Sequence, residues 1–488
     1  MDASFDLLLP HVTRWRSLTV LTDTWSPMHT TLFRLNSSLA STAPLLESLT
    51  LMRCNQFACY SPHFQPHNMK GPKFVPFGAS SRSPFPRLRS LNLTGVHVDW
   101  SALASILPTP TTHDDHSSSS TGGLHSLELS YHANEVRPTV AEFRDILSAC
   151  PHLESLIVKA SGPLLLPEDD DVEIDDNAAR DDIGDHRPIS LPRLDDLVLG
   201  YTSALNGCKI LDILDAPNVK IFTLEDESHP ANPIDEDAEC LLTYLATGVI
   251  ETNYHQPAVD PSPVTDKFAT GTVTTEDNTP TNTLPSPLPT LTLRIPTPPP
   301  PPALTIPFPQ LEDLTLTRVK ACPSTFKTFF SALHRLQRLE LEHTSTHVAH
   351  GLLPQQEGTY TTEIASSSCP CPELNDLDGR GAYVDLDFIV GGLVSRRNEG
   401  GASSEFGDVE IYWDGYGDDV ECPRCCHGGG GVCADVVPVL GTDVKVFRRP
   451  CGLGASTGDD EERRYDPFVL GGTFNDPAFD EYYGQHGV

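Results

Sequence analysis

Apolar and polar positions follow one repeated pattern along this chain. A breaker residue, usually proline, precedes the segment Leu-x-x-Leu-x-Leu, as in Pro86–Leu93, Pro151–Val158 and Pro309–Leu316. The last four residues of this repeat phrase alternate, as they do in a short strand with one buried face. Copies in the same register begin at Trp15, Pro44, Pro86, Leu124, Pro151, Pro192, Pro217, Pro309 and Leu333. Each copy therefore predicts a strand.

Helical periodicity occupies the intervals before several phrases. Thr139 and Glu142 form a capping-box pattern, and Phe143, Ile146 and Leu147 then share one helical face. Shorter or similar patterns occupy residues 103–107, 210–214 and 324–333. Because proline cannot continue a helix, the breaker before each phrase ends the helix before the next strand begins.

Strand, loop, helix and breaker therefore alternate in a repeated unit that cannot bury its apolar face alone. Stacking such units predicts an α/β fold, a leucine-rich-repeat solenoid with a curved parallel sheet and helices on the convex side. We expect the array to be irregular and to carry disordered insertions. A doubly wound α/β domain shares the alternation, but its strands would not repeat one phrase.

Composition divides the chain into four regions. Residues 1–246 form an N-terminal repeat block with an acidic insertion at 167–188, and residues 247–307 form a Thr/Pro-rich linker. Residues 308–413 form a C-terminal repeat block, and residues 414–488 form a Cys/Gly-rich acidic tail that we expect to be mostly disordered. The proline run 298–302 in the linker is expected to act as a spacer rather than as a ligand for an SH3-like groove.

The phrases resemble the repeat region of fungal F-box/leucine-rich-repeat proteins. The residues that carry the resemblance are His11–Leu18, Phe85–Leu91, Cys150–Leu156 and Phe308–Leu314. The resemblance implies a protein-interaction scaffold related to the substrate receptors of ubiquitin ligases. In that family an F-box precedes the repeats and docks a Skp-type adaptor. No F-box is recognisable here, so an adaptor is expected only if an F-box exists upstream.

The charge balance narrows the classes of partner. The chain of 488 residues has 67 acidic and 33 basic residues and a net charge of -34. This excess of acid argues against binding to nucleic acid, which needs basic side chains, and against docking on an anionic membrane. The chain has no apolar run long enough to span a bilayer and no secretory signal pattern. With 13 irregularly spaced cysteines, a reduced protein of the cytoplasm or nucleus is expected.

Only the C-terminal cysteines have spacing that suggests metal ligation. Cys422, Cys425, His427 and Cys433 are weak candidates for zinc, because thiolates and imidazole suit its tetrahedral site. No second well-spaced pair accompanies them, and no catalytic motif occurs elsewhere. The sequence therefore predicts no cofactor, no bound metal and no enzymatic activity. The alternative is a zinc-binding protein or enzyme that uses this region.

The predicted binding surface is the concave face of the sheet, which displays the outward alternates of each strand. Those residues are Ser48, Thr50, Met52, Ser90, Asn92, Thr94, Ser126, Glu128, Ser130, Ile157, Lys159, Asp196, Val198, Thr223, Glu225, Asp313, Thr315, Arg338, Glu340 and Glu342. They run from neutral at the N-terminal end to acidic at the C-terminal end. We expect a protein partner with a basic feature at that end.

Overall fold

The structure is a computed structural model of the whole chain, and part of the chain is described. The described residues are 2–36, 43–54, 63–70, 84–108, 123–163, 187–228, 237–250, 306–345, 347–352, 370–374, 376–380, 410–413, 433–436 and 445–448. Every structural statement below refers to these residues.

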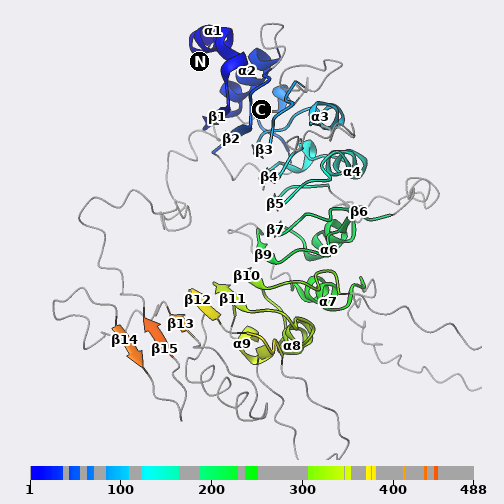
Figure 1. Cartoon of the computed structure of the whole chain (residues 1–488), viewed down its shortest axis with the longest axis vertical. Coiled ribbons are helices and arrows are strands. Elements are labelled where there is room, and N and C mark those ends of the chain that lie inside the picture. Colours follow the sequence, from blue (N-terminus) through cyan, green and yellow to red (C-terminus); the bar gives the residue numbers. More distant parts are fainter. Residues whose placement is uncertain are drawn as a thin grey trace, which may run out of the picture.

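One long sheet follows the chain from end to end (Figure 1). Its strands, in spatial order, are β1 (Ser17–Thr22), β2 (Ser48–Arg53), β3 (Ser90–Thr94), β4 (Ser126–Ser130), β5 (Ser155–Lys159), β7 (Asp196–Tyr201), β9 (Ile221–Asp226), β10 (Asp313–Thr317), β11 (Arg338–Glu342), β12 (Asp376–Arg380), β13 (Glu410–Trp413), β15 (Lys445–Arg448) and β14 (Cys433–Val436). Neighbours are parallel except for β14 and β15. Two short strands, β6 (Ile189–Ser190) and β8 (Leu214–Asp215), pair separately.

The repeat phrases pair in the register that their pattern predicts. The central leucine of each phrase faces its equivalent on the next strand, as Leu49 faces Leu91 and Leu91 faces Leu127. The same alignment continues through Leu156, Leu197, Phe222, Leu314 and Leu339. The predicted parallel arrangement of the phrases is therefore confirmed, including the divergent copy that begins at Trp15.

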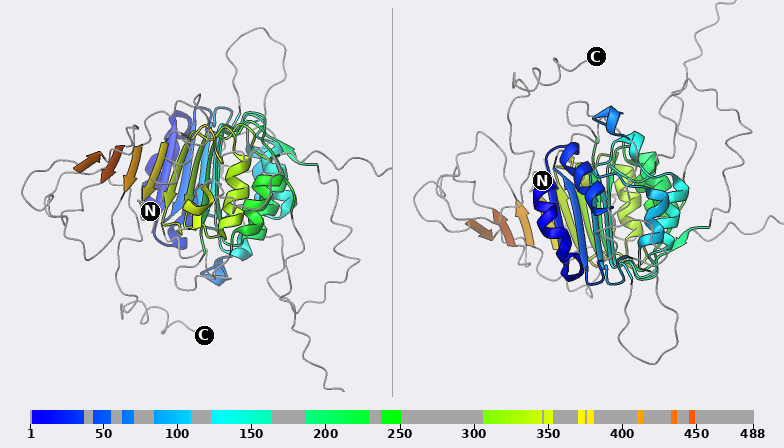
Figure 2. Two further views of the ribbon diagram at one scale, coloured as in Figure 1. Left: turned by 90° about the horizontal axis from the view of Figure 1, so that it is seen from below. Right: turned by 90° about the horizontal axis from the view of Figure 1, so that it is seen from above.

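Helices cover one face of this sheet. The helical elements are α1 (Asp2–Leu8), η1 (Leu9–Arg14), α2 (Trp25–Leu35), η4 (His67–Met69), α3 (Trp100–Ile106), η5 (Asn134–Val136), α4 (Val140–Ser148), α6 (Ala204–Asp212), α7 (Glu239–Thr247), α8 (Pro323–Ala332) and α9 (His347–Leu352). Helices α3 to α9 lie on the same side, and the sheet bends toward its other face (Figures 1 and 2). The doubly wound alternative needs helices on both faces, so it is wrong for the described part of the chain.

Helices form at each predicted position, with some differences at their ends. Thr139 and Glu142 make both bonds of the capping box at the start of α4, with Thr139 N donating to Glu142 Oε2 at 2.9 Å. The helix predicted at 210–214 ends at Asp212 instead, because Leu214 begins β8. Phe326, Phe329 and their neighbours on α8 are buried as expected.

The core lies between the sheet and the helices. The central leucines of the phrases are buried there; Leu91 is 3%, Leu156 0%, Leu197 1% and Leu314 1% exposed. One cluster of buried side chains extends from the first repeat to β12. The two predicted repeat blocks therefore share a sheet, since β10 pairs directly with β9. Their independence as domains stays a prediction.

A buried histidine links three neighbouring strands of the sheet. His132 follows β4 and is 1% exposed. Its Nδ1 lies 2.7 Å from Ser161 Oγ, and its Nε2 lies 3.0 Å from Val96 O. The imidazole therefore connects three successive repeats through one side chain.

Candidate functional site

The face of the sheet that none of the described helices covers, which we call the open face, presents three rows of side chains in register. The amino row is Ser17, Ser48, Ser90, Ser126, Ser155, Asp196, Ile221, Asp313, Arg338 and Asp376. The middle row is Thr19, Thr50, Asn92, Glu128, Ile157, Val198, Thr223, Thr315, Glu340 and Asp378. The carboxyl row runs through Leu21, Met52, Thr94, Ser130, Lys159, Gly200, Glu225, Thr317 and Glu342.

All the residues predicted for the binding surface lie in these rows, and two of them are buried rather than exposed. Thr94 is 6% and Ser130 is 0% exposed. The Thr94 hydroxyl donates to Asn92 Oδ1 at 2.7 Å, and the Ser130 hydroxyl donates to Glu128 Oε1 at 3.2 Å. These two side chains therefore orient their neighbours instead of meeting a partner. Most of the others are half-buried.

Aliphatic side chains gather at the centre of the open face. Ile157 on β5 faces Val198 on β7 in the middle row, and Ile221 on β9 lies in the amino row. Ile221 is 41% exposed, which is high for a large apolar side chain within a sheet. We call these three residues the aliphatic patch. Ile221 was absent from the predicted binding surface, although it is the outward alternate before the buried Phe222.

Five side chains from β4, β5, β9 and β10 meet at the carboxyl ends of these strands, and we call them the rim cluster. Lys159 Nζ lies 2.7 Å from Glu225 Oε2, and Arg318 Nη2 lies 3.6 Å from Glu227 Oε2. The Tyr131 hydroxyl donates to Glu227 Oε1 at 3.3 Å. The cluster thus joins residues that are far apart in sequence.

Gly200 makes room for this cluster. A Cβ atom at Gly200 would lie 2.8 Å from Glu227 Cγ and 3.0 Å from Lys159 Cα. Since real Cβ atoms do not approach other atoms so closely, any larger residue would displace Glu227 from its place. The sequence alone does not indicate that residue 200 must lack a side chain, because β7 has the same alternation as the other strands.

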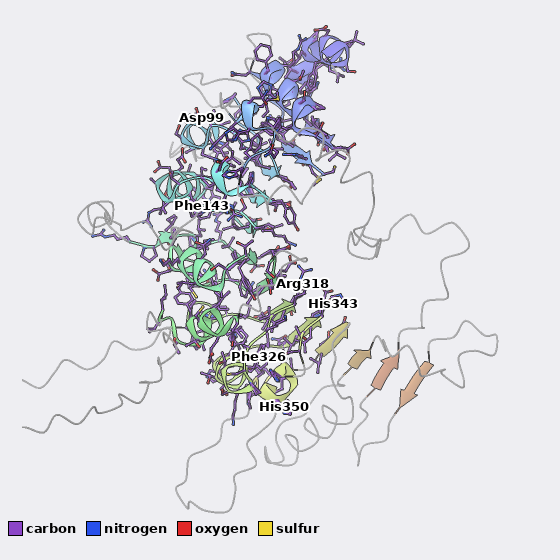
Figure 3. All side chains as sticks on the ribbon, turned by 180° about the vertical axis from the view of Figure 1, so that it is seen from behind. Asp99, Phe143, Arg318, Phe326, His343 and His350 are labelled. Carbon is purple, nitrogen blue, oxygen red and sulfur yellow. The ribbon has the colours of Figure 1, made fainter. Side chains whose placement is uncertain are left out.

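Left-handed backbone positions direct two members of the cluster toward the rim. Tyr131 has φ 57° and Arg318 has φ 59°, a conformation that costs energy for residues other than glycine. Their amides donate to Lys159 O and Glu342 O, each at 2.8 Å, on the next strand. His343 takes the same turn with φ 51°. Figure 3 shows Arg318 and His343 on the strand side of the molecule, opposite Phe143 and Phe326.

Burial raises the pKa of Glu227 to about 7, with Arg318 opposing this rise and Glu225 adding to it. The folded state therefore holds this proton more tightly than the unfolded state does. The resulting stability is fully present below pH 4.5, the ordinary pKa of a glutamate side chain, and is lost as the pH rises to about 7.

We expect Glu227→Gln to be more stable than the native protein at pH 8, on the order of 1 to 3 kcal/mol, since Gln keeps the shape without the buried charge. Urea unfolding at pH 8 and pH 4 measures the difference. Glu47→Gln, at an exposed position before β2, is the control for a carboxyl outside the cluster. An equal effect of Glu227→Gln at both pH values would contradict the assignment.

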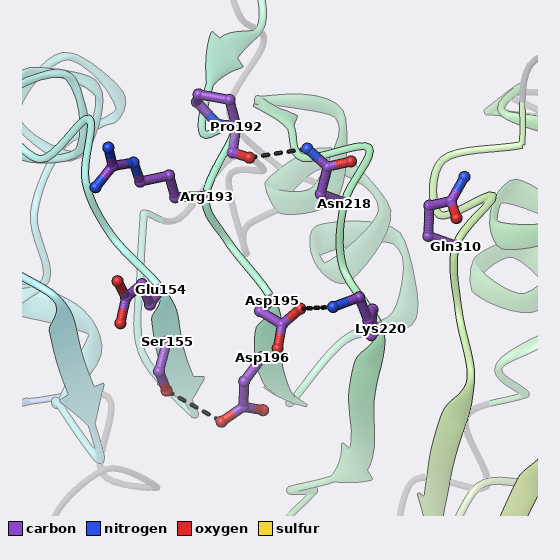
Figure 4. Close-up of a pocket in the computed structure, with 9 residues that line it drawn as sticks. All are labelled: Glu154, Ser155, Pro192, Arg193, Asp195, Asp196, Asn218, Lys220 and Gln310. Carbon is purple, nitrogen blue, oxygen red and sulfur yellow. Dashed lines mark hydrogen bonds and ion pairs between the residues drawn. The ribbon is translucent and has the colours of Figure 1, made fainter.

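A shallow hollow of about 750 Å³ opens at the amino ends of β5, β7 and β9 (Figure 4). Its lining residues are Glu154, Ser155, Pro192, Arg193, Asp195, Asp196, Asn218, Lys220 and Gln310. Lys220 Nζ lies 3.0 Å from Asp195 Oδ1, and the Ser155 hydroxyl donates to Asp196 Oδ2 at 3.1 Å. Burial raises the pKa of Asp196, Ser155 opposes this, and Asp195 adds to it. These polar groups are engaged with one another, and the hollow adjoins Ile221.

Within the described residues, no group of three or more His, Cys, Asp or Glu side chains could hold a metal ion. The weak zinc candidates Cys422, Cys425 and His427 lie outside the described residues. Cys433 lies in β14. Two strands, β14 and β15, thus form within the tail that the sequence analysis expected to be mostly disordered. Strand β13 (Glu410–Trp413) lies at the end of the residues assigned from the sequence to the C-terminal repeat block.

Comparisons with known proteins find structural likeness alone. No protein-family model matches the chain, and no curated protein matches it. A solved structure that it resembles is TLR13 in the crystal structure of the TLR13–ssRNA13 complex, with 10% identity and a TM-score of 0.27. The likeness covers 77% of this chain and 43% of that chain, so the chain spans less than half the length of that relative. None of the described helices is long and apolar enough to cross a membrane.

Proposed function

We propose that the chain is a leucine-rich-repeat solenoid that binds another protein through its open face and catalyses no reaction. The observation that carries this proposal is the continuous row structure of the open face from β1 to β12, which no described element covers. Repeat proteins use such extended faces for recognition. The amino row is serine from β1 to β5, whereas the middle row changes in size and charge from β3 onward, which supports recognition of a specific partner.

The resemblance of the phrases to F-box/leucine-rich-repeat proteins supports a narrower role. In this proposal the open face selects a substrate protein for ubiquitin transfer, and a Skp-type adaptor joins only if an F-box exists upstream. We place this activity in the cytoplasm or nucleus.

Photo-crosslinking from single positions tests the proposal. A benzophenone amino acid at Thr223 or Thr315, both on the open face, should give a partner adduct in cells that make the protein. The control position is Asp145, which is exposed on α4 on the helical face. Adducts from Asp145 alone, or equal adducts from both faces, would contradict binding through the open face.

The substrate-receptor role has a separate readout. If the partner is a substrate for ubiquitin transfer, its half-life should lengthen when the gene is deleted, and it should shorten again when the native protein is restored. If the half-life of the crosslinked partner does not change, the chain is a binding protein and the receptor role is wrong.

A further inference from the structure

We propose that the aliphatic patch and the acidic strands β10 to β12 form one two-part docking site for a basic segment of a partner protein. An apolar side chain of the segment packs on Ile157, Val198 and Ile221, and its Lys or Arg side chains lie over the acidic strands. This inference rests on the proposed function and names the chemistry of the partner.

The position of the aliphatic patch on the open face supports an anchor site. On β3 and β4 the amino and middle rows carry Ser, Asn and Glu, whereas three neighbouring strands of the centre carry branched aliphatic side chains. Leu21 and Met52 are further apolar residues of the open face, and they lie on β1 and β2, well away from the patch. Central apolar side chains surrounded by polar ones form the usual hot spot of a protein interface.

The charges beyond the patch select a basic partner. The described open-face side chains of β10, β11 and β12 include the carboxylates Asp313, Glu340, Glu342 and Asp376. Asp378 lies in the same rows, but it is 5% exposed and does not meet a partner. Among these described side chains Arg338 is the one cation, and it lies 3.8 Å from Glu340 and 3.6 Å from Asp376. Carboxylates therefore outnumber cations among the described open-face side chains of these strands.

Acidic residues also flank the exposed anchor itself. Ile221 lies between Asp196 and Asp313 in the amino row. A segment that buries its apolar side chain on Ile221 thus brings neighbouring residues close to carboxylates. The same carboxylates repel phosphate groups, so a protein segment fits this site and a nucleic acid does not.

The sheet geometry sets the spacing of the recognised residues. Val198 on β7 and Glu340 on β11 are separated by β9 and β10. With neighbouring strands roughly 4.8 Å apart, the two side chains lie roughly 14 Å from each other along the sheet. An extended chain advances roughly 3.3 Å per residue, so an extended partner with its anchor over Val198 places the basic residue that reaches Glu340 about four residues away.

Selection from a random-peptide library on phage, with the full chain as target, tests the site. The selected peptides should combine an aliphatic residue with Lys or Arg about four residues away. Ile221→Ser should weaken binding of a selected synthetic peptide on the order of tenfold. Glu340→Gln with Glu342→Gln should weaken it similarly and reduce its sensitivity to salt, because fewer charge pairs are left to screen.

Matched controls lie off the open face. Val249→Ser removes an aliphatic side chain that is 47% exposed just after α7, and Asp145→Asn removes an exposed carboxylate on α4. Both should leave peptide affinity unchanged. Circular dichroism melting of every variant identifies any loss of affinity that comes from unfolding.

Other outcomes separate the two proposals. Peptides that compete with crosslinking at Thr223 but carry no basic residue would overturn this inference and leave the proposed function standing. A dimer of the chain that dissociates on Ile221→Ser would show that a second copy occupies the patch, which also overturns it. If no selected peptide depends on Ile221 or on Glu340 and Glu342, the docking site is wrong. If crosslinking from Thr223 and Thr315 also fails, the proposed function fails with it.

Discussion

Leu314→Ala should destabilise the protein by about 2 to 5 kcal/mol, whereas Thr315→Ala should cost about 0.5 kcal/mol or less. The two residues are neighbours on β10, but Leu314 is 1% exposed in the core and Thr315 lies on the open face. Removing three carbon atoms from a packed interior leaves a cavity that the surrounding helices and strands fill only in part. The Thr315 side chain leaves no such cavity.

Chemical denaturation followed by far-ultraviolet circular dichroism measures both variants. Leu224→Ala and Thr223→Ala are a second matched set, with Leu224 in the core and Thr223 on the open face. Similar losses at core and open-face positions would mean that the strand register is wrong. The open-face rows, the aliphatic patch and both proposals would then have to be withdrawn.

The strands could be predicted because their signal repeats. Each phrase alternates in the same way, so a divergent copy such as Trp15–Val20 can be identified by comparing it with the other phrases. The copy at Pro372–Gly379 was missed, although Leu374 and Leu377 are buried and β12 pairs in register with β11. Its last apolar position is Gly379, so the alternation stops one step early. A single weak copy is visible only after the structure places it beside β11.

The open-face rows followed from the same alternation, but the contacts on that face did not. The rim cluster depends on the left-handed turns at Tyr131 and Arg318 and on the absence of a side chain at Gly200. Residue type does not reveal such turns, because Tyr and Arg adopt them only when the surrounding structure requires it. The alternation therefore predicted which side chains line the open face, and the structure was needed to find the residues that are engaged with one another.

Acid should destabilise the native protein more than it destabilises the variant His132→Asn. Burial lowers the pKa of His132 from 6.5 to about 3, Val96 opposes this through its hydrogen bond, and the charge of Arg137 adds to it. Between pH 6.5 and about pH 3, His132 therefore binds a proton in the unfolded chain but not in the folded state. The stability that depends on neutral His132 is present above pH 6.5 and is lost as the pH falls to about 3.

The expected loss is on the order of 4 kcal/mol, since each unit of pKa shift corresponds to about 1.4 kcal/mol. Asn suits the comparison because it does not titrate and its amide offers a donor and an acceptor, as the neutral imidazole does. Urea unfolding of both proteins at pH 7 and pH 4 measures the effect. From pH 7 to pH 4 the free energy of unfolding should fall more for the native protein than for His132→Asn. His334→Asn, at an exposed position before β11, is the control. If His132→Asn and His334→Asn respond alike to pH, the buried imidazole does not govern the acid stability of the repeat.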